Sequence, residues 1–405
     1  MSGAERVPAS ASVRVHGAIS GIGRDAWDAL ANPGWPSERP LDADGEGLPP
    51  YNPFISYDFL SSLEESGSAT ERTGWAAHHL VLEGAGGAVA AMPLYLKRHS
   101  MGEYVFDHGW AEAYQRAGGR YYPKLQSSVP FTPATGRRLL TAPGEDADEN
   151  QRTLAIAAAE LAGREHLSSV HVTFMAEAEW ALCARLGYLQ RTDQQYHFVN
   201  RGYRDFADFL DSLVSRKRKA LRRERREAVE AGLEIELLTG SDLTEAAWDA
   251  FFAFYRDTGS RKWGRPYLNR AFFSLIGERM ADRVLLALAR NGDRYVAGAL
   301  NFIGSDTLFG RYWGMTEFHR FLHFELCYYR AIDWAVERGL ARVEAGAQGE
   351  HKVARGYEPT TTRSAHWISD RQFREAVANY LRQEREYVAM EGQALAEHMP
   401  FRKGD

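Results

Sequence analysis

The chain has 405 residues, of which 44% are hydrophobic and 25% are charged, and its formal net charge is −5 at pH 7. This length exceeds what a single hydrophobic core usually serves, so we expect two domains. The acidic balance excludes a general attraction to nucleic acid, so a polyanionic partner would need a local basic patch.

Neither the N-terminus nor any later segment predicts export or membrane insertion. Residues 1–20 lack a basic stretch followed by an apolar run, and no window has the roughly 18 uninterrupted apolar residues of a membrane span. Cys183 and Cys327 lie far apart in apolar, helical-looking contexts, which predicts reduced thiols rather than a disulfide or a metal pair. We therefore expect a cytoplasmic protein without a membrane span.

The first half of the chain predicts an α/β domain, residues 51–196, after a partly irregular N-terminal extension, residues 1–50. Its expected helices cover residues 53–67, 151–166 and 178–187. Its expected strands cover residues 78–84, 87–100, 103–109, 124–132, 168–175 and 194–200. Gly187 is the expected end of the third helix, because glycine readily adopts the left-handed conformation that closes helices.

The second half, residues 197–405, repeats the order of strand, helix, hairpin, strand, helix and strand. Its expected helices cover residues 206–231, 245–259 and 324–339. Its expected strands cover residues 233–239, 282–292, 294–304, 306–314 and 341–347. The Asn291-Gly292 pair is a strong hairpin signal, and the repeated order predicts a duplicated α/β unit.

Two long segments resemble a known family. Residues 121–140, YYPKLQSSVPFTPATGRRLL, and residues 323–359, which include EAGAQGEHKVARGYEP, are similar to the FemAB-like branch of the GNAT acyltransferases. This resemblance implies a bacterial α/β protein with mixed sheets, built from two tandem GNAT-like domains, that transfers an acyl group to an amine. Fem transferases take that group from aminoacyl-tRNA and add it to a cell-wall precursor, whereas the fold alone does not determine a substrate.

A glycine-containing turn at residues 133–140 is a candidate phosphate site. In GNAT enzymes a turn at this place directs backbone N–H groups at the pyrophosphate of an acyl carrier. Here Gly136, Arg137 and Arg138 would bind the phosphate, and the alternative is an ordinary turn with two solvated arginines. The equivalent segment of the second half, residues 313–325, has no glycine after Gly314, which departs from the coenzyme A pattern.

The expected helix at residues 206–231 carries a dense run of cations between Ser215 and Glu227. Helical spacing places four of these cations on one face: Lys219, Arg222, Arg223 and Arg226. The functional interpretation is a surface that binds tRNA or a diphosphate-bearing precursor with salt-sensitive affinity. The alternative is a solvated helix face that is neutralised by Glu224, Glu227 and Glu230.

Polar side chains among aromatic residues predict a substrate cleft. In the first half the expected cleft residues are Asp107, His108, Trp110, Tyr122 and Lys124. In the second half they are Arg311, Trp313, His323, Glu325, Gly349, Glu350 and His351. His319 and His323 are four residues apart, but no cysteine or carboxylate completes a ligand set, so we expect no metal site.

The segment EAGAQGEHKVARGYEP, residues 344–359, holds the expected catalytic residues, Glu344, Lys352 and Arg355. Aminolysis of an ester or thioester needs a deprotonated amine, donors for the developing oxyanion, and a cleft that excludes water. Glu344 is the candidate base or amine anchor. Lys352 and Arg355 would hold a phosphate or carboxylate or stabilise the oxyanion, and the alternative is a structural ion pair between Lys352 and Glu350.

Together these features predict a FemAB-like N-acyltransferase, either an aminoacyltransferase or an acetyltransferase, with no permanently bound cofactor. Aminoacyl-tRNA is the favoured donor, and the acceptor is an amine of a small molecule or a cell-wall precursor. Two other functions remain open. One is an acyl-CoA-dependent N-acyltransferase that acts on a small metabolite, and the other is a non-catalytic protein that binds a peptidoglycan precursor or RNA.

Overall fold

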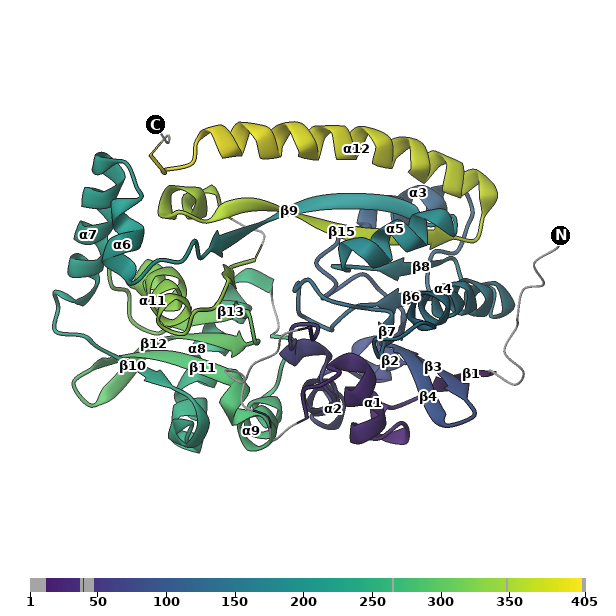
Figure 1. Ribbon diagram of the computed structural model, residues 1–405, viewed down its shortest axis with the longest axis horizontal. Coiled ribbons are helices and arrows are strands. Elements are labelled where there is room, and N and C mark those ends of the chain that lie inside the picture. The colour runs from purple at the N-terminus through teal and green to yellow at the C-terminus, as the bar shows by residue number, and fades with distance from the viewer. Residues whose placement is uncertain (1–11, 37–38, 40–46, 264–265, 347–348, 403–405) are drawn as a thin grey trace.

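The structure is a computed structural model that describes residues 12–36, 39, 47–263, 266–346 and 349–402. Its strands form an 11-stranded sheet that runs through both halves and a 4-stranded sheet in the first half (Figure 1). No helix in the described part of the chain is long and apolar enough to cross a membrane.

The large sheet has the strand order β10-β11-β12-β13-β14-β9-β15-β8-β6-β5-β2, and the small sheet has the order β1-β3-β4-β7. The first-half strands are β1 Ser12–His16, β2 Trp75–Ala77, β3 His79–Gly84, β4 Gly87–Met92, β5 Tyr95–Lys97, β6 Lys124–Ser127, β7 Leu140–Thr141, β8 Ser169–Val172 and β9 Leu189–Val199. The second-half strands are β10 Glu234–Leu238, β11 Val284–Asn291, β12 Arg294–Ile303, β13 Thr307–Met315, β14 Arg342–Glu344 and β15 Glu358–Ile368.

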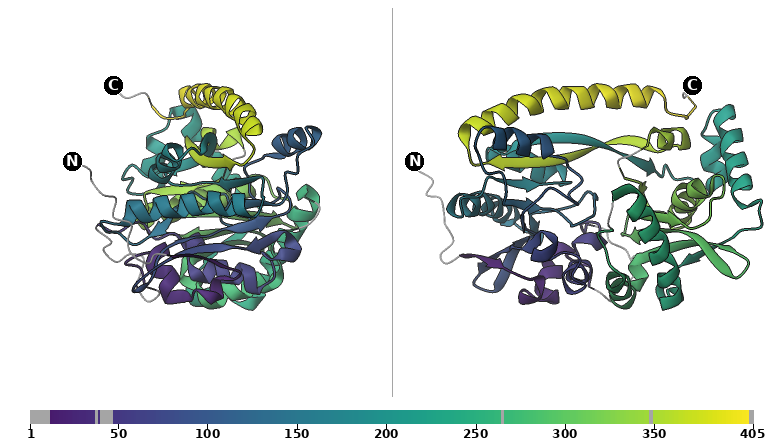
Figure 2. Two further views of the ribbon diagram at one scale, coloured as in Figure 1. Left: turned by 90° about the vertical axis from the view of Figure 1, so that its right-hand side faces the viewer. Right: turned by 180° about the vertical axis from the view of Figure 1, so that it is seen from behind.

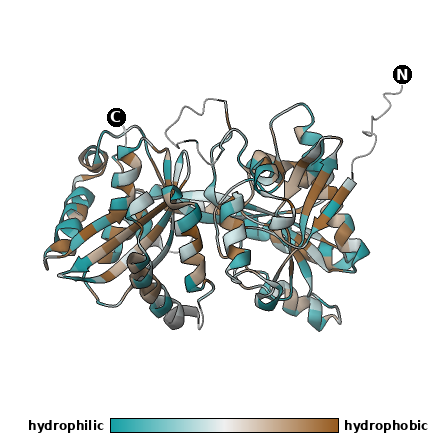
Figure 3. Ribbon diagram, turned by 90° about the horizontal axis from the view of Figure 1, so that it is seen from below, coloured by the Kyte–Doolittle hydropathy of each residue, from teal (hydrophilic) through white to brown (hydrophobic). Residues whose placement is uncertain are grey.

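Helices cover the sheets on their outer faces (Figure 2). The first-half helices are α1 Arg24–Ala31, α2 Tyr57–Glu65, α3 His108–Arg116, α4 Ala147–Arg164 and α5 Glu177–Arg185. The second-half helices are α6 Phe206–Asp211, α7 Ser215–Val229, α8 Glu245–Trp263, α9 Arg270–Arg279, α10 Leu322–Phe324, α11 Arg330–Glu337 and α12 Arg371–Glu397. Hydrophobic residues gather on the strands of both halves (Figure 3).

A parallel strand pair with a helical crossover occurs once in each half. In the first half β6 pairs with β8 through α4, and in the second half β13 pairs with β14 through α10 and α11. A parallel connection requires such a crossover, whereas antiparallel strands need only a short turn. The predicted mixed α/β fold with a duplicated unit is confirmed.

Two long strands join the halves. β9 pairs with β15 from Leu189 to His197 and then with β14 of the second half, while β15 pairs with β8 of the first half. Helix α12 packs on both of these strands and spans the two halves (Figure 1). The expected boundary at residues 196/197 therefore lies inside β9, and the C-terminal strand belongs to the sheet of both halves. The expected N-terminal extension contributes β1 and α1, and β1 pairs with β3.

One aromatic core also crosses between the halves. The ring of Phe54, before α2, lies 5.0 Å from that of Phe302 on β12 and 5.1 Å from that of Phe309 on β13. Asn52 and Ser56 fix the start of this segment, because their side chains accept the backbone N–H groups of Phe54 and Phe59. Burial of large aromatic side chains at this junction stabilises the two halves as one body.

Most local predictions are confirmed because their signals are local. Gly187 and Gly339 follow α5 and α11 with φ of +87° and +64°, as the left-handed ends of helices require. The hairpin predicted at Asn291-Gly292 forms one residue later. Asn291 pairs with Arg294, so that the turn residues are Gly292 and Asp293.

Several predicted elements were wrong. Residues 103–105 form bends and residues 106–107 are irregular, so no strand forms there, and α3 begins at His108. The single helix expected at residues 206–231 is two helices, α6 and α7. Between them, the backbone N–H of Val214 donates to the carbonyl oxygen of Pro400 at 2.9 Å. This hydrogen bond to the C-terminal segment replaces the intrahelical one, and the helix is interrupted there. Helix α8 continues past Gly259, because glycine inside a helix weakens it without necessarily ending it.

Candidate active site

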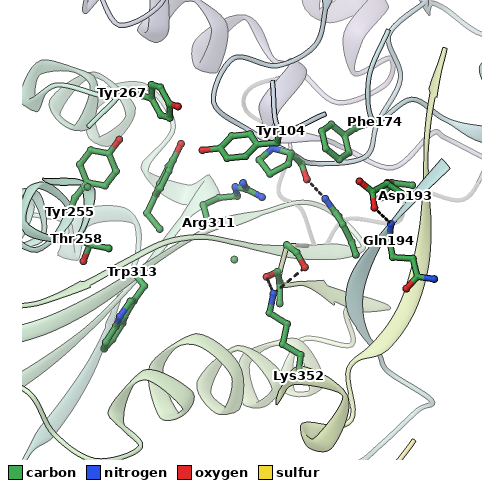
Figure 4. A pocket seen from close by; sticks show the side chains of 18 of the residues that line it. Tyr104, Phe174, Asp193, Gln194, Tyr255, Thr258, Tyr267, Arg311, Trp313 and Lys352 are labelled. Atoms are coloured by element: carbon green, nitrogen blue, oxygen red, sulfur yellow. Dashed lines mark hydrogen bonds between the residues drawn. The ribbon is translucent and has the colours of Figure 1, made fainter. Parts of the chain in front are cut away.

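A cavity of about 340 Å³ lies between the two halves (Figure 4). From the first half it is lined by Tyr104 and Phe106, by Pro133 and Phe174, and by Asp193, Gln194 and Gln195 of β9. From the second half it is lined by Tyr255, Thr258, Gly259, Pro266, Tyr267, Gly310, Arg311, Tyr312, Trp313, His323, Ala345, Gly346, Lys352 and Thr362. Aromatic walls with a few polar groups are typical of small-molecule sites.

The cavity exists because β13 and β14 diverge. These strands pair from Thr307 to Phe309 with Arg342 to Glu344, and the next residues of β13, Gly310 to Trp313, line the cavity instead. A register shift in the β12–β13 ladder makes Arg311 an extra residue, a bulge that redirects the strand beside the cavity. A smaller cavity of about 110 Å³ shares this part of β13 and extends toward Leu300 and Cys327.

Strained backbone gathers around the cavity. The lining residues Tyr104 and Phe174 have φ of +59° and +53°, a conformation that costs energy for bulky residues. Phe131 has φ of +59° and stacks on the lining residue Tyr267, with ring centroids 4.8 Å apart. Such strain persists where the surrounding structure fixes it, which is common at ligand sites.

Lys352 directs its amine at the cavity wall. Its Nζ donates to the carbonyl oxygens of Ala345 at 2.5 Å and Gly346 at 3.0 Å (Figure 4). An ammonium has three donors, so one N–H remains for a ligand. Burial, with a smaller contribution from the charge of Arg311, lowers the pKa of Lys352 to about 8. The alternative partner, the side chain of Glu350, lies outside the described residues.

The other two expected catalytic residues do not line this cavity. Glu344 is buried on β14, with its Oε1 3.9 Å from Nε2 of His197, and burial raises the pKa of Glu344 to about 7. The guanidinium of Arg355 contacts Glu224 of α7 at 2.8 Å, and it donates to the hydroxyl of Tyr329, just before α11, at 3.1 Å. Lys352 and Arg355 therefore do not share one ligand.

Asp107 and Lys124, expected in the cleft, instead form a buried ion pair at 2.5 Å. The hydroxyl of Tyr121 donates to the same carboxylate at 2.6 Å. Although burial opposes ionisation, the charge of Lys124 holds the pKa of Asp107 well below its usual range. Glu103 lies 3.5 Å from Lys124, so this ion cluster fixes the segment on both sides of the cavity residue Tyr104.

The other first-half residues that were expected in the cleft also lie beside the cavity rather than in its lining. Trp110 is buried, and its ring centroid lies 5.0 Å from that of His366. The hydroxyl of Tyr122 lies 2.8 Å from Oγ of Ser100. His108 is exposed at the start of α3 and stacks on the cavity residue Phe106.

In the turn that was expected to bind phosphate, the backbone N–H donors are already bound to a side chain of the protein. The carboxylate of Glu179, on α5, accepts the backbone N–H groups of Arg138 at 2.9 Å and Leu139 at 3.1 Å. Arg138 is fully buried and donates to backbone carbonyls, and Arg137 donates to the carbonyl oxygen of Thr141. A β-bridge between Gly136 and Met175 continues the β6–β8 pairing. The prediction of a phosphate site at Gly136, Arg137 and Arg138 was wrong, because a side-chain carboxylate occupies the donors.

In the second half, three expected cleft residues do line the cavity: Arg311, Trp313 and His323. Glu325 is buried away from it and pairs with Arg225 at 3.1 Å and Arg330 at 2.8 Å. His351 contacts the hydroxyl of Tyr328 at 3.0 Å. Gly349 has φ of +110°, a conformation that favours glycine, and a Cβ there would lie 2.2 Å from the His351 ring.

The cations expected to share one face of α7 are exposed: Lys219, Arg222, Arg223 and Arg226. Arg222 lies 3.8 Å from Asp211, and Arg223 lies 3.5 Å from Glu227. Exposed ion pairs of this kind contribute little to stability. Arg225 instead turns inward to Glu325 and Asp333. The helix therefore presents a basic outer face and an ion-paired inner face.

Several cavity residues had no signal in the sequence. Asp193, Gln194 and Gln195 lie on a strand whose sequence carries no recognisable site motif. Tyr255 and Thr258 lie on a helix with regular apolar spacing. They meet at one cavity because β9 crosses between the halves.

Comparisons with known proteins agree with this fold. The FemAB-like family, described as peptidoglycan biosynthesis/recognition, matches residues 18–403. The crystal structure of FemX is similar with a TM-score of 0.52 at 12% identity, over 88% of this chain and 98% of FemX. A conserved protein of unknown function from Bacteroides thetaiotaomicron has a TM-score of 0.50 at 11% identity, over 89% of this chain and 100% of its own.

A tandem GNAT protein from the clavulanic acid biosynthesis pathway is also similar. Its TM-score is 0.43 at 13% identity, over 89% of this chain and 98% of its own. No curated protein matches the chain in sequence. At these identities the likeness to solved structures concerns the fold alone.

Proposed function

The chain belongs to the FemAB-like family of peptidoglycan biosynthesis/recognition proteins, and from this we propose that it is an N-acyltransferase acting in the cavity between its halves. It moves an aminoacyl or acyl group from a carrier onto the amine of a small molecule or cell-wall precursor. The observation that carries this proposal is the amine of Lys352 in the wall of an aromatic cavity where β13 and β14 diverge.

In this reaction the acceptor nitrogen attacks the carbonyl carbon of the donor. A C–N bond forms, the bond to the carrier oxygen or sulfur breaks, and the acceptor loses a proton. The remaining N–H of the Lys352 ammonium stabilises the oxyanion, because a charged donor acts strongly where water is excluded. A pKa of about 8 keeps Lys352 mostly protonated at pH 7. Asp193 and His323 line the same cavity and are candidate proton acceptors.

Aminoacyl-tRNA is the favoured donor. The exposed face of α7 carries four cations that match a phosphate backbone. The backbone donors that would bind the pyrophosphate of coenzyme A in the first half are bound to Glu179. Acyl-CoA remains the alternative donor, and it would have to bind without that turn.

The test offers the purified chain radiolabelled aminoacyl-tRNA and radiolabelled acyl-CoA in parallel, with a cell extract as the source of acceptors. We expect label to move from aminoacyl-tRNA, and Lys352→Ala to reduce transfer about 100-fold or more. Arg371→Ala, which changes a cation with 91% side-chain exposure on α12, is the matched control. Transfer from neither donor would favour a non-catalytic binding protein instead.

A further inference from the structure

Arg311 differs from the other arginines of the protein interior. Arg138, Arg225 and Arg355 each bind several acceptors. The half-buried side chain of Arg311 has no hydrogen-bond acceptor and no ion-pair partner within the described part of the chain, and its Nε is covered. A guanidinium has five donors, and leaving them partly desolvated and unbound is costly. This side chain is therefore arranged to meet an acceptor that the protein does not supply.

Neighbouring groups leave the charge of Arg311 uncompensated. The charge of Arg311 lowers the pKa of the nearby Glu344, but burial has the larger effect and raises that pKa to about 7. No ion pair within 4 Å joins the two side chains. Lys352 adds a second positive charge, and its pKa is lowered partly by Arg311. The cavity is thus positive at this point of β13.

Phenol groups surround the same guanidinium. Tyr104 and Tyr312 both experience the charge of Arg311, and Figure 4 shows Tyr104 beside Arg311 with Tyr255 and Tyr267 on one side of it. The hydroxyl of Tyr255 accepts the backbone N–H of Leu268 at 3.1 Å, so its hydrogen is available for a ligand. These hydroxyls can donate to an anion without adding charge.

We propose that Arg311, with Tyr104 and Tyr255, forms a subsite for the carboxylate of an amino acid or short peptide. A planar guanidinium matches a carboxylate through two parallel hydrogen bonds. The described lining residues offer no second arginine and no glycine-rich cradle, which a phosphate group would favour. Asp193 lies away from Arg311 along the cavity in Figure 4, where the ammonium group of the same ligand would meet it.

The size of the cavity agrees with this ligand class. A cavity of about 340 Å³ lies at the small end of the roughly 300–1,000 Å³ of ligand pockets, which suits an amino acid or short peptide. The assignment of this ligand as the acyl acceptor rests on the proposed function, whereas the carboxylate subsite itself does not.

The test labels the arginines of the full-length protein with phenylglyoxal and follows each one by mass spectrometry. Glycylglycine, its C-terminal amide and inorganic phosphate are added in separate samples. We expect glycylglycine to slow the labelling of Arg311 about tenfold and the amide to leave it unchanged. Arg371, exposed on α12, is the internal control. Protection by phosphate but not by glycylglycine overturns the carboxylate assignment, and protection by neither overturns the anion subsite.

Because labelling uses the unaltered protein, the result does not depend on whether a variant folds or whether transfer occurs. Once transfer is measured, Arg311→Gln should raise the KM for a carboxylate-bearing acceptor about tenfold, with a smaller change for its amide. Arg311→Lys should restore part of that loss. An equal KM for both acceptors in the unaltered protein and the Arg311→Gln variant would also contradict the subsite. Failure of all transfer alongside protection of Arg311 would reject the proposed function alone.

Discussion

Arg355 provides a sharp test of whether its role is structural or catalytic. Its guanidinium binds Glu224 of α7 at 2.8 Å, the hydroxyl of Tyr329 at 3.1 Å and the carbonyl oxygen of His351 at 2.7 Å, and it lies 3.4 Å from the Phe324 ring centroid. The side chains of Arg355 and Glu224 are only 8% and 13% exposed. Arg355→Ala would therefore leave a nearly buried carboxylate without its cation.

Breaking a buried ion pair from one side costs about 3–5 kcal/mol, because the remaining charge stays desolvated. For a chain of this size we expect a fall in melting temperature of about 4–6 °C. Denaturant unfolding followed by circular dichroism measures the free energy, and Arg371→Ala, on an exposed pair, should change it by about 0.5 kcal/mol or less.

A second variant separates the lost contact from the stranded charge. Glu224→Gln combined with Arg355→Met should recover part of the stability lost in Arg355→Ala, because no unpaired charge remains. If Arg355→Ala unfolds within about 0.5 kcal/mol of the unaltered protein, the structural role is refuted. Loss of transfer at unchanged stability would instead support the catalytic role expected from the sequence.

Two further predictions concern pH and nucleic acid. Burial raises the pKa of Glu344 from 4.5 to about 7. Between these pH values the native state keeps a proton that the unfolded chain has released. The stability that is fully present below pH 4.5 is therefore lost as the pH rises through 7. The loss amounts to about 3 kcal/mol and should be absent in Glu344→Gln. An unchanged pH profile of unfolding in this variant would contradict the assignment. Replacing Arg222, Arg223 and Arg226 with glutamate should abolish a gel shift with total tRNA, with Arg371→Glu as control. Unchanged tRNA binding would remove the basis for the tRNA donor.

The candidate site was only partly visible in the sequence. Lys352, Arg311, Trp313 and His323 were expected there and line the cavity, because polar residues at the end of a core strand mark the edge where α/β sheets bind ligands. The turn at Gly136 matched a family pattern, yet its donors bind Glu179, 41 residues away from Arg138. The spacing of residues in the turn carries no information about that distant carboxylate.

The sequence by itself determined the local elements and the duplicated α/β order, because side-chain periodicity, glycine at helix ends and turn residues act over a few neighbouring positions. It also indicated the family through residues 121–140 and 323–359. The tertiary structure decided which charged residues face a ligand and which face each other. Arg355 meets Glu224 across 131 positions, while Arg311 meets no acceptor among the residues that the structure describes. These outcomes depend on how β9 and β15 join the halves, since burial and charge pairing are set by neighbours in space rather than in sequence.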